Sequence, residues 1–136
     1  MDMKILLIEI NRTAGKYTVT TEDNFFFGQG DSLEHARKAL EKQIRLFVRS
    51  AKREGFSYDK NLDGNYELRY KFDVRRLLLF YEGIISHTAL ERLTGINKKQ
   101  FWSYANGHSR PRLAQVEKIE NALHKLGEEL INISLI

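Results

Sequence analysis

The sequence ISHTALERLTGINKKQFWSYANGHSRPRL (residues 85–113) contains two short helical patterns separated by a glycine. Ser86 precedes the first pattern, Leu90 and Leu93 lie on one side of it, and Gly95 follows it. Serine before a helix and glycine after it satisfy backbone groups that the helix leaves free. This arrangement predicts a helix that begins after Ser86 and turns at Gly95.

The second pattern begins after Asn97, which can cap a helix, and it ends near Gly107. Phe101 and Tyr104 are spaced to face inward on this helix. Two short helices joined by a glycine-containing turn form a helix-turn-helix, whose second helix enters the DNA major groove with its N-terminal residues at the base edges. The segment therefore predicts a DNA-binding element.

One position departs from the usual pattern of such elements. Four residues before the turn glycine, where a small residue normally allows the two helices to cross closely, this chain has Glu91, and its alanine comes earlier at Ala89. We therefore expect either a longer turn or a wider crossing. Both alternatives shift the base-contacting positions by about one residue.

The predicted DNA contacts combine base reading with phosphate binding. Lysine contacts guanine, glutamine pairs with adenine, and arginines in the following loop bind phosphates. The alternative is an ordinary helical bundle with a solvated basic face. The predicted DNA-contacting residues are Asn97, Lys98, Lys99, Gln100, Trp102, Ser103, Arg110 and Arg112.

The charge distribution of the chain supports the prediction that residues 85–113 bind DNA. The chain has 136 residues with 22 Lys and Arg against 18 Asp and Glu, a net charge of +4. Basic and acidic residues balance up to residue 68, so the whole excess lies after it. A basic surface indicates a polyanionic partner. No acid lies between Glu91 and Glu117, where the basic residues are Arg92, Lys98, Lys99, Arg110 and Arg112.

The N-terminal half has strand patterns bounded by turn-forming residues. Residues 3–10, 16–21 and 24–29 predict a three-stranded antiparallel meander, and residues 66–72 predict a fourth, edge strand. The three phenylalanines within 24–29 cannot all face the same side of a strand. At least one of them is covered by the helix or a loop, or else belongs to a protein-binding surface.

A long amphipathic helix is predicted between the third and fourth strands. Asp31 is the expected N-cap with Glu34 as its reciprocal partner, and Gly55 is the expected end. Gly28 and Gly30 lack the third glycine of a dinucleotide fingerprint and predict only a turn. The stripe that would pack on the sheet consists of Leu33, Ala36, Leu40, Ile44, Phe47 and Ala51.

The predicted fold class is α+β, with two domains. Residues 1–70 form the small antiparallel sheet with its helix, and residues 71–136 form an all-α helix-turn-helix domain. Pro111 interrupts the helical half and marks a loop. The tail ELINISLI (residues 129–136) predicts a short C-terminal strand that pairs with another subunit.

Several classes of function lack support in the sequence. The chain has no cysteine, in agreement with a reducing, cytoplasmic compartment, and its N-terminal apolar run is too short to span a membrane. Residues 59–64 copy half of a calcium loop, but Tyr70 stands where the bidentate glutamate belongs. We therefore predict no metal and no cofactor, and because no nucleophile has an orienting base, no enzymatic activity.

The chain resembles the HicB antitoxin family of toxin–antitoxin systems, in particular its longer members with an Xre-like DNA-binding half. The resemblance rests on the short sheet, on GQGDSLEHA (residues 28–36), and on the C-terminal pattern ERLTGIN, YANGHSRPR and IENALHKLGEEL. Gly30, Asp31 and Leu33 match the family's Gly-Asp-Thr-Leu helix entry, with Ser32 in place of threonine, and the recognition helix falls on 97–106.

The resemblance implies a degenerate RNase H-like domain that blocks a small, mRNA-cleaving HicA-like toxin. It also implies a second domain that represses the operon by binding operator DNA as a homodimer or higher homo-oligomer. Many relatives have a Pro-Asp-Leu-Pro-Gly loop, where this chain has residues 22–26. Two alternatives remain: a stand-alone regulator whose N-terminal domain dimerises or binds a small ligand, and a metal-dependent nuclease using Glu9, Glu22 and Asp23.

Overall fold

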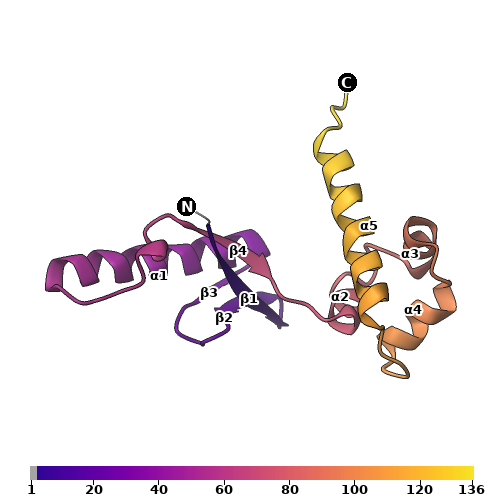
Figure 1. Cartoon of the computed structure of the whole chain (residues 1–136), viewed down its shortest axis with the longest axis horizontal. Coiled ribbons are helices and arrows are strands. Elements are labelled where there is room, and N and C mark those ends of the chain that lie inside the picture. The colour runs from indigo at the N-terminus through magenta and orange to yellow at the C-terminus, as the bar shows by residue number, and fades with distance from the viewer. Residues whose placement is uncertain (1–2) are drawn as a thin grey trace. The chain divides into compact units, whose positions relative to one another are not determined.

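The structure, a computed structural model, describes residues 3–136 and divides into two compact units (Figure 1). The first unit ends at Lys71 and the second begins at Phe72, one residue beyond the boundary expected from the sequence. The described chain is mixed α+β, with a four-stranded sheet in the first unit and five α-helices over both units.

The sheet consists of β1 (Lys4–Thr13), β2 (Lys16–Thr21), β3 (Phe27–Gly30) and β4 (Tyr66–Tyr70), in the order β3-β2-β1-β4. The first three strands pair antiparallel, whereas β4 pairs parallel with β1. The expectation of a wholly antiparallel sheet was therefore wrong. A helix connects β3 to β4, and such a crossover returns the chain in the same direction, which makes a parallel strand possible.

The third strand begins later than predicted, because a turn precedes it. Asn24 has a left-handed backbone (φ 59°), and the chain pairs with β2 again only from Phe27. The three phenylalanines differ in burial: Phe26 is buried, whereas Phe25 and Phe27 are more than half exposed. Phe26 packs edge-on against Phe47 of the helix at 5.4 Å between ring centroids.

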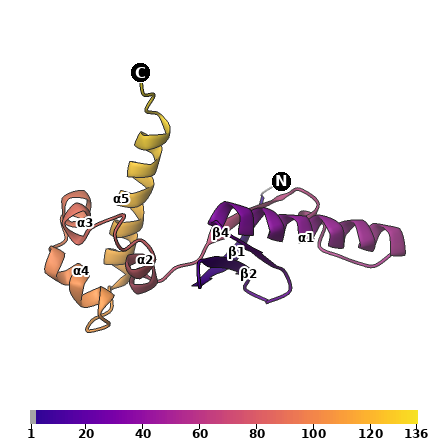
Figure 2. The same cartoon turned by 180° about the vertical axis from the view of Figure 1, so that it is seen from behind.

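One face of the sheet is covered by α1 (Leu33–Glu54), as both views show (Figures 1 and 2). The N-cap is Ser32, whose hydroxyl accepts from the His35 N–H at 3.1 Å, so the prediction of Asp31 was wrong by one residue. Gly55 ends the helix as predicted, with φ 75°. The buried residues of α1 are Ala36, Leu40, Ile44, Val48 and Ala51. Val48 was not in the predicted stripe, and the predicted Leu33 and Phe47 are only partly buried.

Gly28 and Gly30 lie in β3 and allow α1 to approach the sheet closely. A Cβ atom added at Gly28 would lie 2.2 Å from the Ala36 carbonyl oxygen, and one added at Gly30 would lie 2.7 Å from the Cβ of His35. These glycines are therefore required for packing, and the sequence-based assignment to a simple turn was incomplete.

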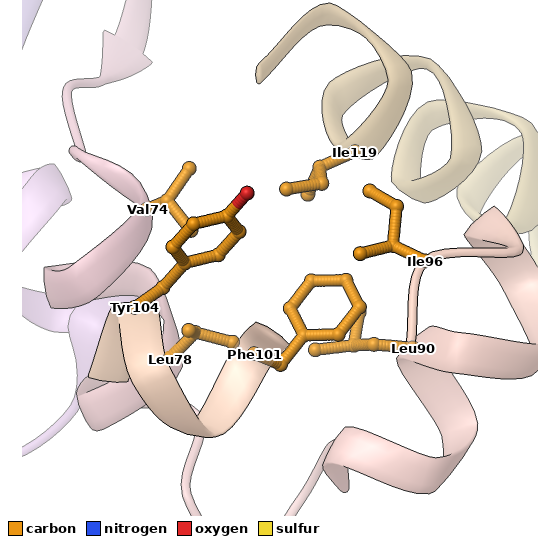
Figure 3. Packing of buried hydrophobic residues seen from close by; sticks show 7 residues of the cluster. All are labelled: Val74, Leu78, Leu90, Ile96, Phe101, Tyr104 and Ile119. Carbon is orange, nitrogen blue, oxygen red and sulfur yellow. The ribbon is translucent and has the colours of Figure 1, made fainter. Parts of the chain in front are cut away.

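The second unit contains α2 (Val74–Phe80), α3 (His87–Thr94), α4 (Lys98–Ala105) and α5 (Leu113–Ile131). Their inward side chains meet in one apolar cluster (Figure 3). Phe101 is completely buried at its centre, so α4 is fixed by its inner face. The cluster consists of Val74, Leu78, Leu90, Ile96, Phe101, Tyr104 and Ile119.

Two further expectations for this unit were wrong. Leu93 is 37% exposed, and the core position near the end of α3 is taken by Thr94, whose hydroxyl donates to the Leu90 carbonyl at 2.7 Å. The predicted C-terminal strand is absent from the described residues, because α5 continues to Ile131 and Asn132 caps it. The described residues of the second unit contain no sheet edge with which residues 129–136 could pair, so the first of these residues continue the hydrogen bonding of α5 instead.

Among residues 3–136, no helix has the length and hydropathy needed to cross a lipid bilayer.

Candidate nucleic-acid interface

The junction between α3 and α4 is stabilised by side chains at both helix ends. The Ser86 hydroxyl accepts from the Ala89 N–H at 3.0 Å, and the Asn97 side chain accepts from the Lys99 N–H at 2.8 Å. Gly95 turns the chain with φ 76°. The caps and the turn predicted from the sequence are confirmed, and α4 occupies the predicted positions.

Glu91 explains the departure noted in the sequence. Its carboxylate accepts a hydrogen bond from the backbone N–H of Lys98 at 2.7 Å. The first free N–H of α4 is thus satisfied by a side chain of α3, and a negative charge lies at the positive end of the α4 dipole. The acidic residue therefore joins the two helices, and it occupies the place where a phosphate would otherwise meet the α4 N-terminus.

The outer side of α4 is exposed because its inner side is anchored in the core. Phe101 and Tyr104 are buried, whereas Lys98, Lys99 and Trp102 lie on the solvent side. Trp102 is 55% exposed, which is unusual for so large an apolar side chain. This outer side holds three of the predicted contacts.

Two of the predicted base-reading residues are already engaged by the loop that follows α4. Gln100 donates from Nε2 to the Ser109 hydroxyl at 3.0 Å, and the Ser103 and Ser109 hydroxyls lie 2.7 Å apart in a hydrogen bond. All three side chains are partly buried. In this arrangement one N–H of the Gln100 amide is used by Ser109, while the second N–H and the acceptor oxygen Oε1 have no partner among the described residues.

An aromatic pair extends the surface beyond α4. The His108 ring stacks on the Trp102 indole with centroids 5.2 Å apart and planes inclined by 17°. Asn106 donates from its side chain to the Trp102 carbonyl at 2.8 Å and closes the helix. The stacking holds the exposed indole in one orientation.

The loop after α4 carries Arg110 and Arg112, both exposed. Arg110 also lines a cavity of about 520 Å³ within the second unit, together with Arg75 of α2 and Tyr104. The Arg75 guanidinium lies against Gly107, where an added Cβ would be 3.1 Å from it. Arg75 thus belongs to this basic surface although it is distant in sequence.

Two acids lie near this surface: the Glu91 carboxylate accepts from the Lys98 backbone N–H, and Asp73 lines the same cavity as Arg75 and Arg110. Among the described residues 3–136, none of the ion pairs formed includes Lys98, Lys99, Arg110 or Arg112. In the first unit, by contrast, eight basic side chains form ion pairs. The structure therefore brings the predicted residues together on α4 and the adjoining loop, with Asn97 used as a cap.

Sequence reasoning missed Ser109 and Arg75 as members of this site. Ser109 has no spacing signal, because its partners lie on a helix that ended four residues earlier. Arg75 lies in a different helix, and only the side chain's approach to Gly107 connects it to the loop. The one available signal was a glycine within a basic loop, which marks a close approach of another group.

The uncovered face of the sheet is a second candidate surface. Ile5 and Leu7 are of opposite parity along β1 to the buried Ile8 and Ile10, and Phe27 is adjacent in β3 to Gly28, which lies against α1, so all three lie on the other face of the sheet. They are 45%, 36% and 53% exposed. At the rim, the Lys71 ammonium lies 2.8 Å from the Glu22 carboxylate. Apolar side chains grouped within a charged rim are typical of a protein-binding surface.

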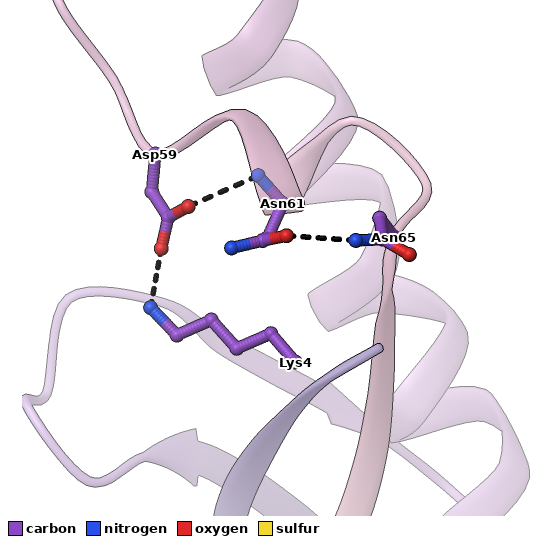
Figure 4. Close-up of polar contacts among 4 residues, drawn as sticks. All are labelled: Lys4, Asp59, Asn61 and Asn65. Carbon is purple, nitrogen blue, oxygen red and sulfur yellow. Dashed lines mark hydrogen bonds and ion pairs between the residues drawn. The ribbon is translucent and has the colours of Figure 1, made fainter. Parts of the chain in front are cut away.

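The calcium-like loop holds its polar side chains by internal contacts (Figure 4). Asp59 forms an ion pair with Lys4 and accepts from the Asn61 N–H at 3.0 Å, and Asn65 donates to the Asn61 side chain at 2.8 Å. The Lys4 ammonium holds the pKa of Asp59 below its usual value. Throughout residues 3–136, no group of three or more potential metal-ligating side chains is present.

Comparison of the chain with protein-family models, with curated proteins and with solved structures finds no match.

Proposed function

We propose that the second unit binds operator DNA, with α3, the Gly95 turn and α4 acting as a helix-turn-helix. The observation that carries the proposal is the row of exposed cations on α4 and the loop after it, none of which forms an ion pair with another described residue. The opposite side of α4 is fixed in the core by Phe101, so the basic side is presented rigidly. Such a surface suits a phosphate backbone and the major groove.

In this proposal the side chains of α4 and of the loop after it make different contacts with DNA. Lys98 and Lys99, at the N-terminal end of α4, contact guanine or bind phosphate, while Arg110 and Arg112 bind the phosphates of the DNA backbone. Gln100 pairs with adenine through Oε1 and the second hydrogen of Nε2, while the first hydrogen of Nε2 is bonded to Ser109, which orients the amide. Trp102 supplies an apolar contact for a thymine methyl group.

We further propose that the first unit binds a protein partner through the uncovered sheet face. Ile5, Leu7 and Phe27 supply the exposed apolar surface. The resemblance to HicB antitoxins makes a HicA-like toxin the expected partner, and covering the toxin's active site is the expected mechanism. Together the two units would make an antitoxin that also represses its own operon, without enzymatic activity of its own.

Operator reading of this kind ordinarily uses two copies related by two-fold symmetry. The end of α5 exposes Leu130 and Ile131, which are 57% and 84% accessible. We propose that a second copy of the chain covers them in a homodimer. Replacing both with glutamate should convert a dimer into a monomer in light scattering, whereas an unchanged mass would refute this contact.

The experiment for the DNA half is a gel shift with the purified chain and the DNA upstream of its own gene. A fragment of the same composition in scrambled order serves as the control. Preferential retention of the upstream fragment supports the proposal, and equal retention of both fragments contradicts sequence-specific repression. For the partner half, co-expression with the neighbouring gene and pull-down should recover a stable complex, which Leu7→Glu with Phe27→Glu abolishes.

The second candidate is a stand-alone regulator whose first unit binds a small ligand. A specific observation favours it: the first unit contains an open cavity of about 620 Å³ lined in part by basic side chains. A neighbouring gene that encodes a small basic protein captured in the pull-down favours the antitoxin, and its absence favours this candidate.

A further inference from the structure

A groove on the first unit lies between the second half of α1 and the segment from η1 (Lys60–Leu62) to the start of β4. Its volume of about 620 Å³ is within the range of small-molecule sites. Val48 and Leu62 give it an apolar floor, and Tyr66 adds an aromatic wall. Such a combination of apolar walls with a few polar groups is typical of ligand pockets.

The charges of the residues that line the groove do not cancel, and the excess is positive. The two acids, Glu41 and Asp63, are each paired with a base: Glu41 with Arg37 at 3.7 Å, and Asp63 with Lys52 at 2.5 Å. The remaining two lining cations, Arg45 and Arg49, have no ion pair within the described residues 3–136. The groove therefore contains uncompensated positive charge, although bases and acids balance over residues 1–68.

The two free arginines are arranged to act together. They are four residues apart on α1, so their side chains leave the same face of the helix about 5–6 Å apart. A guanidinium presents a planar fork of donors that fits phosphate oxygens in pairs, and it remains charged at all physiological pH values. Two guanidinium groups beside one cavity can bind a single phosphate group or a diphosphate.

Tyr66, at the start of β4, also lines the groove and carries a hydroxyl donor. Burial raises the pKa of Tyr66, and the nearby Glu41 carboxylate adds to this shift, whereas Arg45 opposes it. The hydroxyl therefore stays protonated, and the charge of Arg45 is close enough to influence it. The Lys52–Asp63 pair links α1 to the loop across the groove and keeps this wall in place.

We propose that this groove binds a phosphate ester, with Arg45 and Arg49 holding the phosphate and Tyr66 beside the rest of the ligand. The same chemistry has two sources, a free nucleotide-sized ligand or the backbone of a single nucleic-acid strand. The cavity volume favours the first source. This site is independent of the α4 surface, since it uses other residues in the other unit.

The test is isothermal titration calorimetry on the full chain carrying Lys98→Glu, Lys99→Glu, Arg110→Glu and Arg112→Glu, which reverses the charge of the four predicted cationic contacts of the α4 surface. The probes are inorganic pyrophosphate, adenosine monophosphate and a short single-stranded DNA of mixed sequence. We expect saturable binding of pyrophosphate and the mononucleotide, weakened about tenfold or more by Arg45→Gln with Arg49→Gln. Binding of the oligonucleotide alone, with the same loss, assigns the phosphate to a nucleic-acid backbone.

The matched control is Lys38→Gln with Lys42→Gln, which removes the same charge from the same helix outside the groove. The control should leave each binding constant within about twofold, because the lost cations do not line the cavity. An equal loss in both double variants would show that general attraction to a basic helix causes the binding, and would overturn the proposal. Absence of binding by all three probes would overturn it as well.

Discussion

The Glu91 carboxylate on α3 accepts a hydrogen bond from the backbone N–H of Lys98, the first residue of α4, at 2.7 Å. This contact spans the turn at Gly95 and joins two helices that also share the apolar cluster around Phe101. It also places a negative charge at the α4 N-terminus, where the helix dipole makes it favourable.

Replacing Glu91 with alanine should lower the free energy of unfolding by about 1 kcal/mol, the usual contribution of a side chain that caps a helix. Glu91→Gln keeps an acceptor oxygen but loses the charge, so we expect a smaller loss. Urea unfolding followed by circular dichroism measures both. Equal stability of all three proteins would show that the bond does not hold the helices together.

Removing the Ser109 hydroxyl should affect sequence preference more than general affinity. Ser109→Ala frees the Gln100 amide and the Ser103 hydroxyl, so the base-reading side chains lose their fixed orientation. A well-oriented base contact is worth about 1–3 kcal/mol of discrimination. We expect about a tenfold lower ratio of upstream to scrambled DNA binding in fluorescence anisotropy, with binding to scrambled DNA unchanged.

The opposite result for Ser109→Ala is equally informative. If the binding to both DNA fragments falls together, Ser109 acts on phosphate contacts or on folding rather than on base reading. Circular dichroism of the variant distinguishes these two cases.

A methyl group at Gly28 should destabilise the first unit. The new Cβ would lie 2.2 Å from the Ala36 carbonyl oxygen and 2.4 Å from the Leu40 nitrogen, so α1 must move away from the sheet. Overpacking against backbone atoms costs about 3 kcal/mol. Thermal unfolding of Gly28→Ala measures the loss.

Gly127→Ala is the matched control for Gly28, because it adds the same methyl group inside α5 with no atom within 4 Å. Alanine there is expected to raise stability by up to about 1 kcal/mol, since glycine is a poor helix former. A similar loss in both variants would contradict the close-packing role of Gly28.

The turn between β2 and β3 should become weaker in acid. The Thr21 hydroxyl donates to Asp23 at 2.6 Å and the Phe25 N–H donates at 3.0 Å, and together they hold the pKa of Asp23 below its ordinary value of 3.8. The ionised carboxylate therefore stabilises the fold fully above about pH 4, and this contribution disappears as the pH falls through the lowered pKa.

Nuclear magnetic resonance titration of the Asp23 carboxyl checks this directly. We expect a midpoint below 3.8 in the natural sequence and a rise towards 3.8 in Thr21→Val, which removes the first donor. An unchanged midpoint in Thr21→Val would show that the hydroxyl does not control the ionisation of Asp23.

Features set by neighbouring residues were predictable from the sequence. The caps at Ser86 and Asn97, the turn at Gly95 and the end of α1 at Gly55 all follow from short-range chemistry. Each of them depends on a side chain bonding to backbone groups within three residues or on a left-handed φ. The exposed positions on α4 follow from its helical period in the same way.

Features that depend on distant partners were not predictable. The parallel pairing of β4 with β1 needs the path of α1, and the contact of Arg75 with Gly107 needs the packing of α2. The charge balance over residues 1–68 did not reveal the unpaired charge of Arg45 and Arg49, because only the structure shows that the acids of the groove, Glu41 and Asp63, are paired with other bases. Local composition therefore predicted the elements, while their tertiary contacts decided the sites.

DNA binding by the α4 surface is tested by Lys98→Glu with Lys99→Glu, which reverses two charges at the N-terminal end of α4. The control is Lys118→Glu with Lys125→Glu, the same charge change on exposed positions of α5, which carries none of the predicted base contacts. The measurement is fluorescence anisotropy with the upstream DNA over a series of salt concentrations. We expect the control to bind with a salt dependence near that of the natural sequence. We expect the α4 variant to lose binding while it keeps its circular dichroism spectrum, whereas unchanged binding by the α4 variant would contradict the account.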